Sequence, residues 1–117
     1  MMAGRDAGGD AGGDDDELVW KALSDPTRRA ILDLLRDGPR TTGDIAAGFL
    51  DVTRFAVMKH LGRLHEAGLV IVETRGRERW HYLNAVPIRR IYDRWIRPFA
   101  EEPADAMLRI KRLAEGR

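Results

Sequence analysis

The feature of this sequence that most constrains its fold is one strongly patterned helical segment between Thr53 and Gly68. Val57, Leu61 and Leu64 recur at a spacing that places their side chains on one side of a helix. Threonine is a residue type that begins helices and glycine is one that ends them, so both boundaries are marked. The pattern predicts a helix that packs one side on a small core and exposes the other.

Three shorter helical patterns come before this segment. The first begins near Glu17, and the second follows Asp25 and Pro26, a capping residue and a proline that fits the first helical turn. The third follows Thr41, with Asp44 at the position where a capping box carries an acidic side chain. This part of the chain is therefore predicted to be helical, with short breaks.

A hairpin pattern and two further helical patterns follow. Residues 69–83 combine a β-branched run, a glycine-centred turn and aromatic side chains at alternate positions, which predicts two antiparallel strands. Pro87 opens a helix with a wide apolar side, and we expect Pro98 to end or kink it. A last amphipathic helix is predicted around residues 107–114.

Helices followed by a basic hairpin form the order of a winged helix-turn-helix protein. We therefore expect a mainly α fold with a small β-hairpin, in which the first helix and the helix that Pro87 opens form a dimer interface. The predicted domains are a disordered, acidic, Gly- and Asp-rich tail at residues 1–16, a winged helix-turn-helix domain for DNA binding and dimerisation at residues 17–100, and a C-terminal helical extension at residues 101–117.

The charge is unevenly distributed along the 117 residues, although the formal net charge is only +1. The first 17 residues are strongly acidic and the rest of the chain is basic, which is compatible with a polyanionic partner. The chain has no cysteine, so disulfides and thiolate metal sites are excluded. Because it has no apolar run that could span a membrane or act as a signal peptide, we expect a cytoplasmic protein without a membrane partner.

The exposed side of the helix between Thr53 and Gly68, together with the hairpin turn, supplies the candidate DNA contacts. Basic side chains there can reach phosphates or guanine edges, and Phe55 and Met58 can contact thymine methyl groups. Arginines around one glycine suit phosphates or a narrow minor groove, although an ordinary solvated turn explains them equally well. For the helix, a protein-binding surface is the alternative. The predicted DNA-binding residues are Thr53, Arg54, Phe55, Met58, Lys59, Gly62, Arg63, Arg75, Arg77 and Arg79.

Aromatic side chains near both ends of the predicted domain exceed what one small core can cover, which argues for a homodimer. A tightly filled core of a monomer is the alternative. The predicted interface residues are Leu18, Val19, Trp20, Ile88, Ile91, Tyr92, Trp95 and Phe99.

Residues 22–32 (ALSDPTRRAIL) and residues 55–70, which include FAVMKHL and EAGLV, resemble the ArsR/SmtB family of bacterial repressors. The resemblance extends roughly from Leu18 to Phe99 and implies dimerisation through the first and last helices of the family. Metal-sensing members have a Cys-x-Cys motif near the third helix, or Asp and His ligands on the fifth. This chain has no cysteine and offers Asp93 without a histidine, so the resemblance implies a branch that lacks the metal-binding motifs.

The histidines and acidic residues form no catalytic or metal-binding pattern in the sequence. We expect His60 to hydrogen-bond within the fold, His65 to interact with the end of its helix, and His81 to lie in a strand. No pair of them has the spacing of metal ligands, and no nucleophile elbow, phosphate loop or paired carboxylates occur. We therefore predict no catalytic residues, no metal site, no cofactor and no enzymatic activity.

Together these features predict a bacterial transcriptional regulator, a repressor, that binds double-stranded operator DNA as a homodimer. The helix between Thr53 and Gly68 is expected in the major groove, and the hairpin on the backbone or in the minor groove. Two alternatives stay open: a winged-helix module that binds protein through Phe55 and Met58, and an effector sensor with a site in the dimer cleft. The sequence does not identify the effector of such a sensor.

Overall fold

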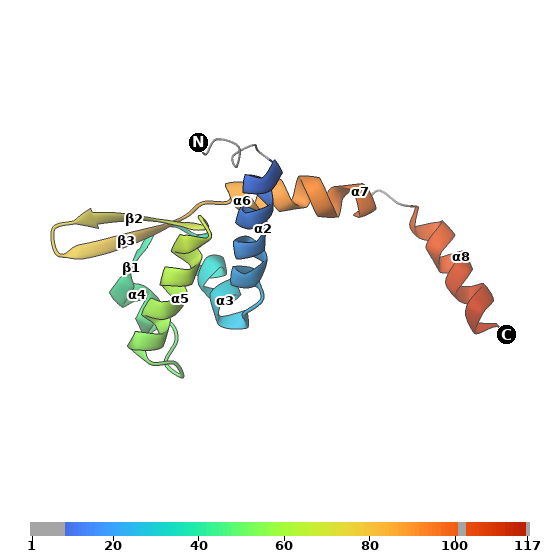
Figure 1. Ribbon diagram of the computed structural model, residues 1–117. Helices are drawn as coiled ribbons and strands as arrows, with labels where there is room; N and C mark the ends of the chain where they lie inside the picture. Colours follow the sequence, from blue (N-terminus) through green and yellow to red (C-terminus); the bar gives the residue numbers. More distant parts are fainter. Residues whose placement is uncertain (1–8, 101–102, 117) are drawn as a thin grey trace.

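The computed structural model describes residues 9–100 and 103–116, and for residues 9–14 the backbone alone. In chain order the elements are α2 (Gly9–Leu23), α3 (Pro26–Leu35), β1 (Arg40–Thr41), α4 (Thr42–Ala47), α5 (Arg54–Glu66), β2 (Val70–Arg75), β3 (Glu78–Leu83), α6 (Val86–Ile91), the π-helix η1 (Tyr92–Ile96), α7 (Arg97–Ala100) and α8 (Ala104–Glu115). In Figure 1 the β2–β3 hairpin projects to one side, next to α4 and α5, while α6 to α7 extends to the other. This arrangement confirms the predicted winged helix-turn-helix fold.

Side-chain caps begin the helices at the predicted positions. Asp25, Thr41 and Thr53 each accept a hydrogen bond from the backbone N–H three residues later, at 3.0, 3.1 and 3.0 Å. Each bond satisfies one of the N–H groups that the first turn of a helix leaves free. After α5, Gly68 adopts a φ of +78°, a left-handed conformation that favours glycine, and the chain turns into β2.

The core lies where α2, α3, α5 and α6 meet the sheet. Val57, Leu61 and Leu64 are buried, as the helical pattern predicts. Isoleucines from the two shorter helices, Ile31 of α3 and Ile45 of α4, complete the layer against which α5 packs. The position of α5 is therefore fixed on its inner side by close apolar packing.

Two residues assigned to the dimer interface belong to this core instead. Val19 and Ile91 expose 0% and 2% of their surface. Side chains that the chain itself covers cannot contact a partner, so the interface assignment of these two residues is wrong. Ile88 packs against the same core and is only partly buried.

The sheet contains one strand more than the predicted hairpin. β1 pairs with β3 in an antiparallel register that sets Arg40 opposite His81 and Thr41 opposite Trp80, so the strand order is β1-β3-β2. A strand of two residues is too short to show alternation in a sequence. Because β1 pairs with β3, the beginning of α4 lies directly against the β2–β3 hairpin. We call this hairpin the wing.

Pro98 was expected either to end or to kink the helix that Pro87 opens. It does not end this helix. The helix continues from α6 through η1 into α7, and Pro98 lies inside α7. Proline cannot donate to the preceding turn and its ring crowds a backbone carbonyl. The backbone N–H of Arg97 donates to the carbonyl of Tyr92, and this wider π-turn precedes the proline.

The first helix begins earlier than predicted. α2 starts at Gly9 rather than near Glu17, and residues 1–8 of the predicted tail lie outside the described part of the chain. Asp16 is held by Arg90 of α6, whose Nε lies 3.3 Å from a carboxylate oxygen. At the other end, α8 contains the predicted amphipathic segment, none of its residues is buried, and it stands apart from the other elements in Figure 1.

Candidate nucleic-acid interface

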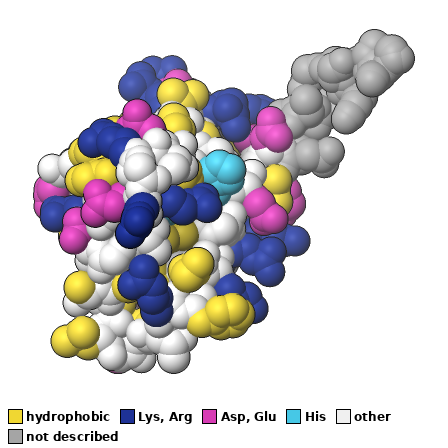
Figure 2. All heavy atoms as spheres, turned by 90° about the vertical axis from the view of Figure 1, so that its left-hand side faces the viewer, with side chains coloured by type: hydrophobic (Ala, Val, Ile, Leu, Met, Phe, Trp, Pro, Cys, Tyr) yellow, Lys and Arg dark blue, Asp and Glu magenta, His cyan; other side chains and the backbone are white. Residues whose placement is uncertain are grey.

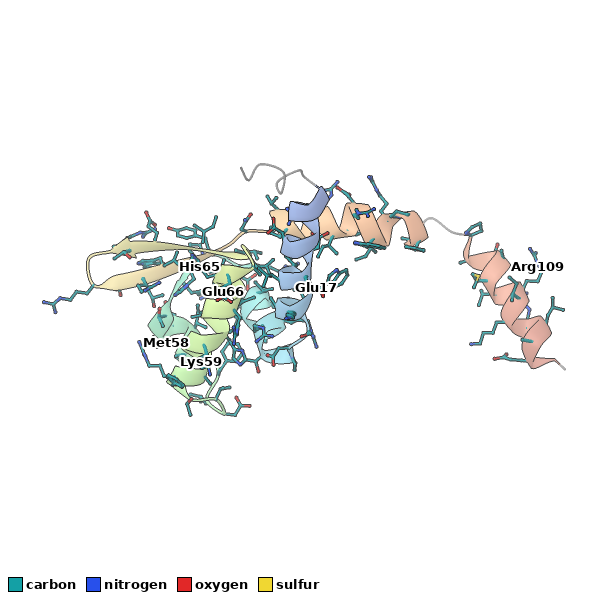
Figure 3. The ribbon with its side chains drawn as sticks, viewed as in Figure 1. Glu17, Met58, Lys59, His65, Glu66 and Arg109 are labelled. Atoms are coloured by element: carbon teal, nitrogen blue, oxygen red, sulfur yellow. The ribbon has the colours of Figure 1, made fainter. Side chains whose placement is uncertain are left out.

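The exposed side of α5 carries large apolar side chains together with basic ones. Phe55 and Met58 expose 71% and 53% of their surface, although an isolated protein gains no stability from exposing them. Lys59 lies above the Phe55 ring, with Nζ 5.7 Å from its centre. Met58 and Lys59 point away from the core near the lower end of α5 in Figure 3.

Every predicted DNA-contact residue is exposed on α5, its cap or the wing. The added Cβ of an alanine at Gly62 would meet nothing within 4 Å, so the backbone is open at this point of the helix. Arg63 lies on the α2 side of α5 and pairs with Glu66 at 3.6 Å. Arg63 is thus separated from the wing by the width of the helix.

A groove of ≈ 340 Å³ runs between the beginning of α5 and the wing. Arg54 and Met58 line it from α5, and Arg77, Glu78 and Arg79 line it from the wing, so three arginines and one carboxylate border it. In Figure 2, which views the molecule from the wing side, basic side chains are spread over this face, with apolar and acidic ones between them. The groove brings Arg54 together with the wing arginines, a grouping that the separate sequence patterns did not reveal.

A third part of the groove lining comes from the beginning of α4, which is not among the DNA contacts predicted from the sequence. Thr41, Thr42 and Gly43 line the groove because β1 pairs with β3 and brings the beginning of α4 beside the wing. Hydroxyls and backbone N–H groups are common phosphate contacts. The helical pattern near Thr41 was visible, but only the strand pairing connects it to the site.

Arg75 differs from the other two wing arginines. Its Nε lies 3.0 Å from Glu73, it donates a second hydrogen bond to the Tyr82 hydroxyl, and its guanidinium stacks 4.7 Å from the Trp80 ring centre. The hydrogen bonds from Tyr82 and Arg75 lower the pKa of the Glu73 carboxyl, so its charge persists. Arg75 is therefore engaged within the wing, whereas Arg77 and Arg79 border the groove.

A polar contact fixes α5 against the preceding helices. His60 of α5 lies 3.2 Å, through Nδ1, from a guanidinium nitrogen of Arg28 in α3. Arg28 also donates to the carbonyl oxygens of Ala22 and Lys21 at 2.8 and 2.9 Å, which close the end of α2. His60 thus hydrogen-bonds within the fold, as expected. Asp25, whose carboxylate lies 3.8 Å from the same ring, has its pKa lowered mainly by the backbone hydrogen bond from Arg28.

The remaining histidines form no metal centre in the described part of the chain. His65 is exposed on α5, and His81 is buried in β3. Residues 15–100 and 103–116, whose side chains the structure describes, contain no group of three or more His, Cys, Asp or Glu side chains that could hold a metal ion. Within residues 9–100 and 103–116, no helix is both long and apolar enough to cross a membrane.

A second exposed apolar surface lies away from the wing, on α2 and on the segment from α6 to α7. We call this surface the aromatic face; its members are Trp20, Tyr92, Trp95, Ile96 and Phe99, each between 38% and 68% exposed. Leu18, two positions from Trp20 on α2, lies on another side of the helix, next to Arg63 and Glu66 of α5. All members of the aromatic face except Ile96 are among the interface residues predicted from the sequence. A surface of this kind on a small domain marks an interaction site.

Comparison with known proteins agrees with this geometry. A family described as a helix-turn-helix domain matches residues 23–73. The transcriptional repressor SdpR of Bacillus subtilis is 39% identical over 71 residues, which cover 61% of this chain and 78% of SdpR. A solved ArsR family transcriptional regulator superposes with a TM-score of 0.64 at 32% identity, over 68% of this chain and 86% of the other. The chain belongs to the ArsR/SmtB family of transcriptional regulators.

Another ArsR/SmtB-type structure covers more of the chain. An ArsR-like transcriptional regulator from Rhodococcus sp. RHA1 has a TM-score of 0.64 at 30% identity, over 86% of this chain and 92% of the other. The matched family is one of transcriptional regulators and not a class of enzymes. The resemblance of residues 22–32 and 55–70 to ArsR/SmtB proteins is thereby confirmed.

Proposed function

We propose that this ArsR/SmtB protein is a repressor that binds specific operator DNA as a homodimer. In this proposal α5 enters the major groove, and the wing contacts the backbone or the adjacent minor groove. Residues 17–100 serve DNA binding and dimerisation, and residues 101–117 form an extension. The protein acts in the cytoplasm, where its DNA is.

One observation carries the proposal: the exposed side of α5 and the wing arginines border a common groove. Arg54, Arg77 and Arg79 place three cations along ≈ 340 Å³ of open space next to Met58. Cations on α5 and on the wing can contact the phosphate strand that separates a major groove from the next minor groove. Phe55 and Met58 then contact base edges, because apolar side chains suit thymine methyl groups.

The homodimer is supported by the aromatic face. Trp20 of α2 and Trp95 of η1 are 41% and 45% exposed, and burying such rings against a second copy removes a large apolar area from water. A symmetric dimer presents two copies of α5, and each reads one half-site of a palindromic operator. Repression, rather than activation, is supported by the similarity to SdpR, which is a transcriptional repressor.

A winged-helix module that binds another protein is the rival function. It is favoured by the exposure of Phe55 and Met58, which would anchor a partner. The groove beside them favours DNA instead, because Arg54, Arg77 and Arg79 suit a row of phosphates, whereas anchoring a protein through Phe55 and Met58 does not require these arginines.

Selection from random duplexes tests the proposal. The full chain is mixed with a library of random-sequence duplexes, bound DNA is separated by gel shift, and the selected sequences are read after several rounds. We expect enrichment of one palindromic sequence with half-sites about one helical turn apart. Failure to enrich any sequence over competitor DNA would contradict the regulator function.

A further inference from the structure

We propose that the hollow between α5 and the inner side of the wing binds a small organic acid, an aromatic or branched-chain monocarboxylate, and that its binding opposes DNA binding. Binding of the acid in the hollow does not depend on the proposed function. The effect of that binding on DNA rests on the proposed function.

The hollow has a volume of ≈ 200 Å³, about that of six or seven liquid waters. Its walls come from four elements: Thr42 of α4, Met58 and His65 of α5, Val72 of β2, and Arg79 and His81 of β3. In Figure 3 Met58 and His65 mark its two ends along α5, with His65 directly below the hairpin. A molecule the size of benzoate fits such a space.

His81 forms part of the base of the hollow. It is 3% exposed, and its Nε2 lies 2.9 Å from the Thr42 hydroxyl. Its Nδ1 is buried without a hydrogen-bond partner among the described residues. Burial, helped by Arg79 and His65, lowers the pKa of His81, so the ring is neutral at neutral pH. Because Nδ1 is almost fully covered, His81 forms a neutral base for the hollow and leaves the charged contact with a ligand to Arg79.

Charge and polarity define the class of ligand. Arg79 brings a cation to the hollow, and none of the described residues that line it is acidic. Met58 and Val72 present apolar walls that suit a hydrocarbon body. A carboxylate toward Arg79 with an apolar group against these walls matches both properties, whereas an inorganic anion matches only the first.

The hollow and the basic groove share side chains. Arg79, Met58 and Thr42 line both spaces. One guanidinium that donates both arms to a carboxylate cannot also hold a DNA phosphate in the same way. Occupation of the hollow therefore lowers the affinity for DNA, and by linkage DNA lowers the affinity for the acid by the same factor.

Binding is tested first without DNA, by ¹H–¹⁵N NMR of the full chain. Benzoate, 3-methylbutanoate and uncharged benzyl alcohol are titrated separately to about 10 mM, a range that detects millimolar dissociation constants. We expect at least one of the two acids to shift the backbone amides of Gly62, Val72 and His81, and benzyl alcohol to shift them much less. If neither acid shifts these amides, or if benzyl alcohol shifts them equally, the inference is wrong.

Two substitutions on one strand provide the matched control. Val72→Phe fills the hollow and should abolish the shifts, while Ile71→Phe, on the exposed outer side of β2, should leave them. If Val72→Phe does not fold, Val72→Leu takes its place and should weaken binding. Shifts that persist unchanged in a folded Val72 variant would place the acid elsewhere.

The effect on DNA is then measured by fluorescence anisotropy with a selected operator. A saturating acid that binds the hollow should weaken operator binding at least about fivefold in the wild type. It should have no such effect in the Val72 variant. If an acid occupies the hollow without changing the affinity for the operator, the proposed effect on DNA binding is wrong. If the chain binds no DNA at all, the proposed function is wrong, but the NMR evidence for binding of the acid is unaffected.

Discussion

Arg28 of α3 and His60 of α5, separated by 32 positions in sequence, meet at 3.2 Å and join the two stretches that mark this family. Arg28 simultaneously donates to two carbonyl oxygens at the end of α2. One guanidinium therefore ties three helices together, and it does so with the fixed fork of donors that only arginine offers.

The first prediction concerns this contact. Arg28→Lys keeps the charge but removes the fork, and we expect the free energy of unfolding in urea to fall by about 2 kcal/mol. The neighbouring Arg29→Lys is the control: Arg29 is exposed and makes one such bond, to Leu23, so it should cost less than about 0.5 kcal/mol. Equal effects of the two variants would show that the contact with His60 does not stabilise the fold.

The second prediction is a pH dependence at His81. Because its pKa is lowered in the folded protein, the unfolded chain binds more protons between the folded value and the ordinary value of about 6.5. The stability contributed by the neutral ring is therefore complete above pH 6.5 and declines as the pH falls. Urea denaturation across this range should show a smaller decline for His81→Gln than for the wild type.

The third prediction separates stability from binding at Gly62. Alanine meets no neighbour there and has the higher helix propensity, so Gly62→Ala should raise the free energy of unfolding by about 0.5–1 kcal/mol. If the open backbone approaches DNA, the same variant should bind the selected operator more weakly. A Gly62→Ala protein that is stabilised and binds with unchanged affinity would remove this point of α5 from the interface.

The fourth prediction tests the dimer. Trp95→Glu places a charge in the aromatic face and should raise the dissociation constant of the dimer at least about tenfold, which is about 1.4 kcal/mol. Light scattering and sedimentation measure it, with circular dichroism to verify folding. Leu50→Glu is the matched control, since Leu50 is 91% exposed in the loop before α5 and away from this face. An unchanged dimer in a folded Trp95→Glu protein would contradict the proposed interface.

Local signals explain what the sequence could predict. The caps at Asp25, Thr41 and Thr53 depend on side chains within one helical turn, and the buried side of α5 follows from a spacing of three and four residues. The hairpin with its turn at Gly76 is also a local pattern, and there the φ is +60°.

What could not be predicted depends on pairing between distant segments. The short strand that contains Thr41 becomes visible only beside β3, and this pairing brings the beginning of α4 into the groove. The interaction of Arg75 with Glu73 and Tyr82 needs the register of the wing. Val19 was assigned to the wrong surface because an apolar residue next to aromatic ones looks the same in sequence whether its own chain or a partner covers it.

The central claim is that α5 reads the operator while the wing supplies charge, and titration of two variants on matched duplexes tests it most directly. Lys59→Ala and Arg77→Ala are compared on the selected operator and on a scrambled duplex, each at several salt concentrations. Lys59→Ala should cost about 1–3 kcal/mol on the operator and much less on the scrambled duplex. Arg77→Ala should weaken both by similar factors and flatten the slope of log K against log salt by about one unit for each phosphate that the protein no longer neutralises. The opposite result, in which Arg77→Ala abolishes sequence preference and Lys59→Ala binds like the wild type, would contradict the placement of α5 in the major groove.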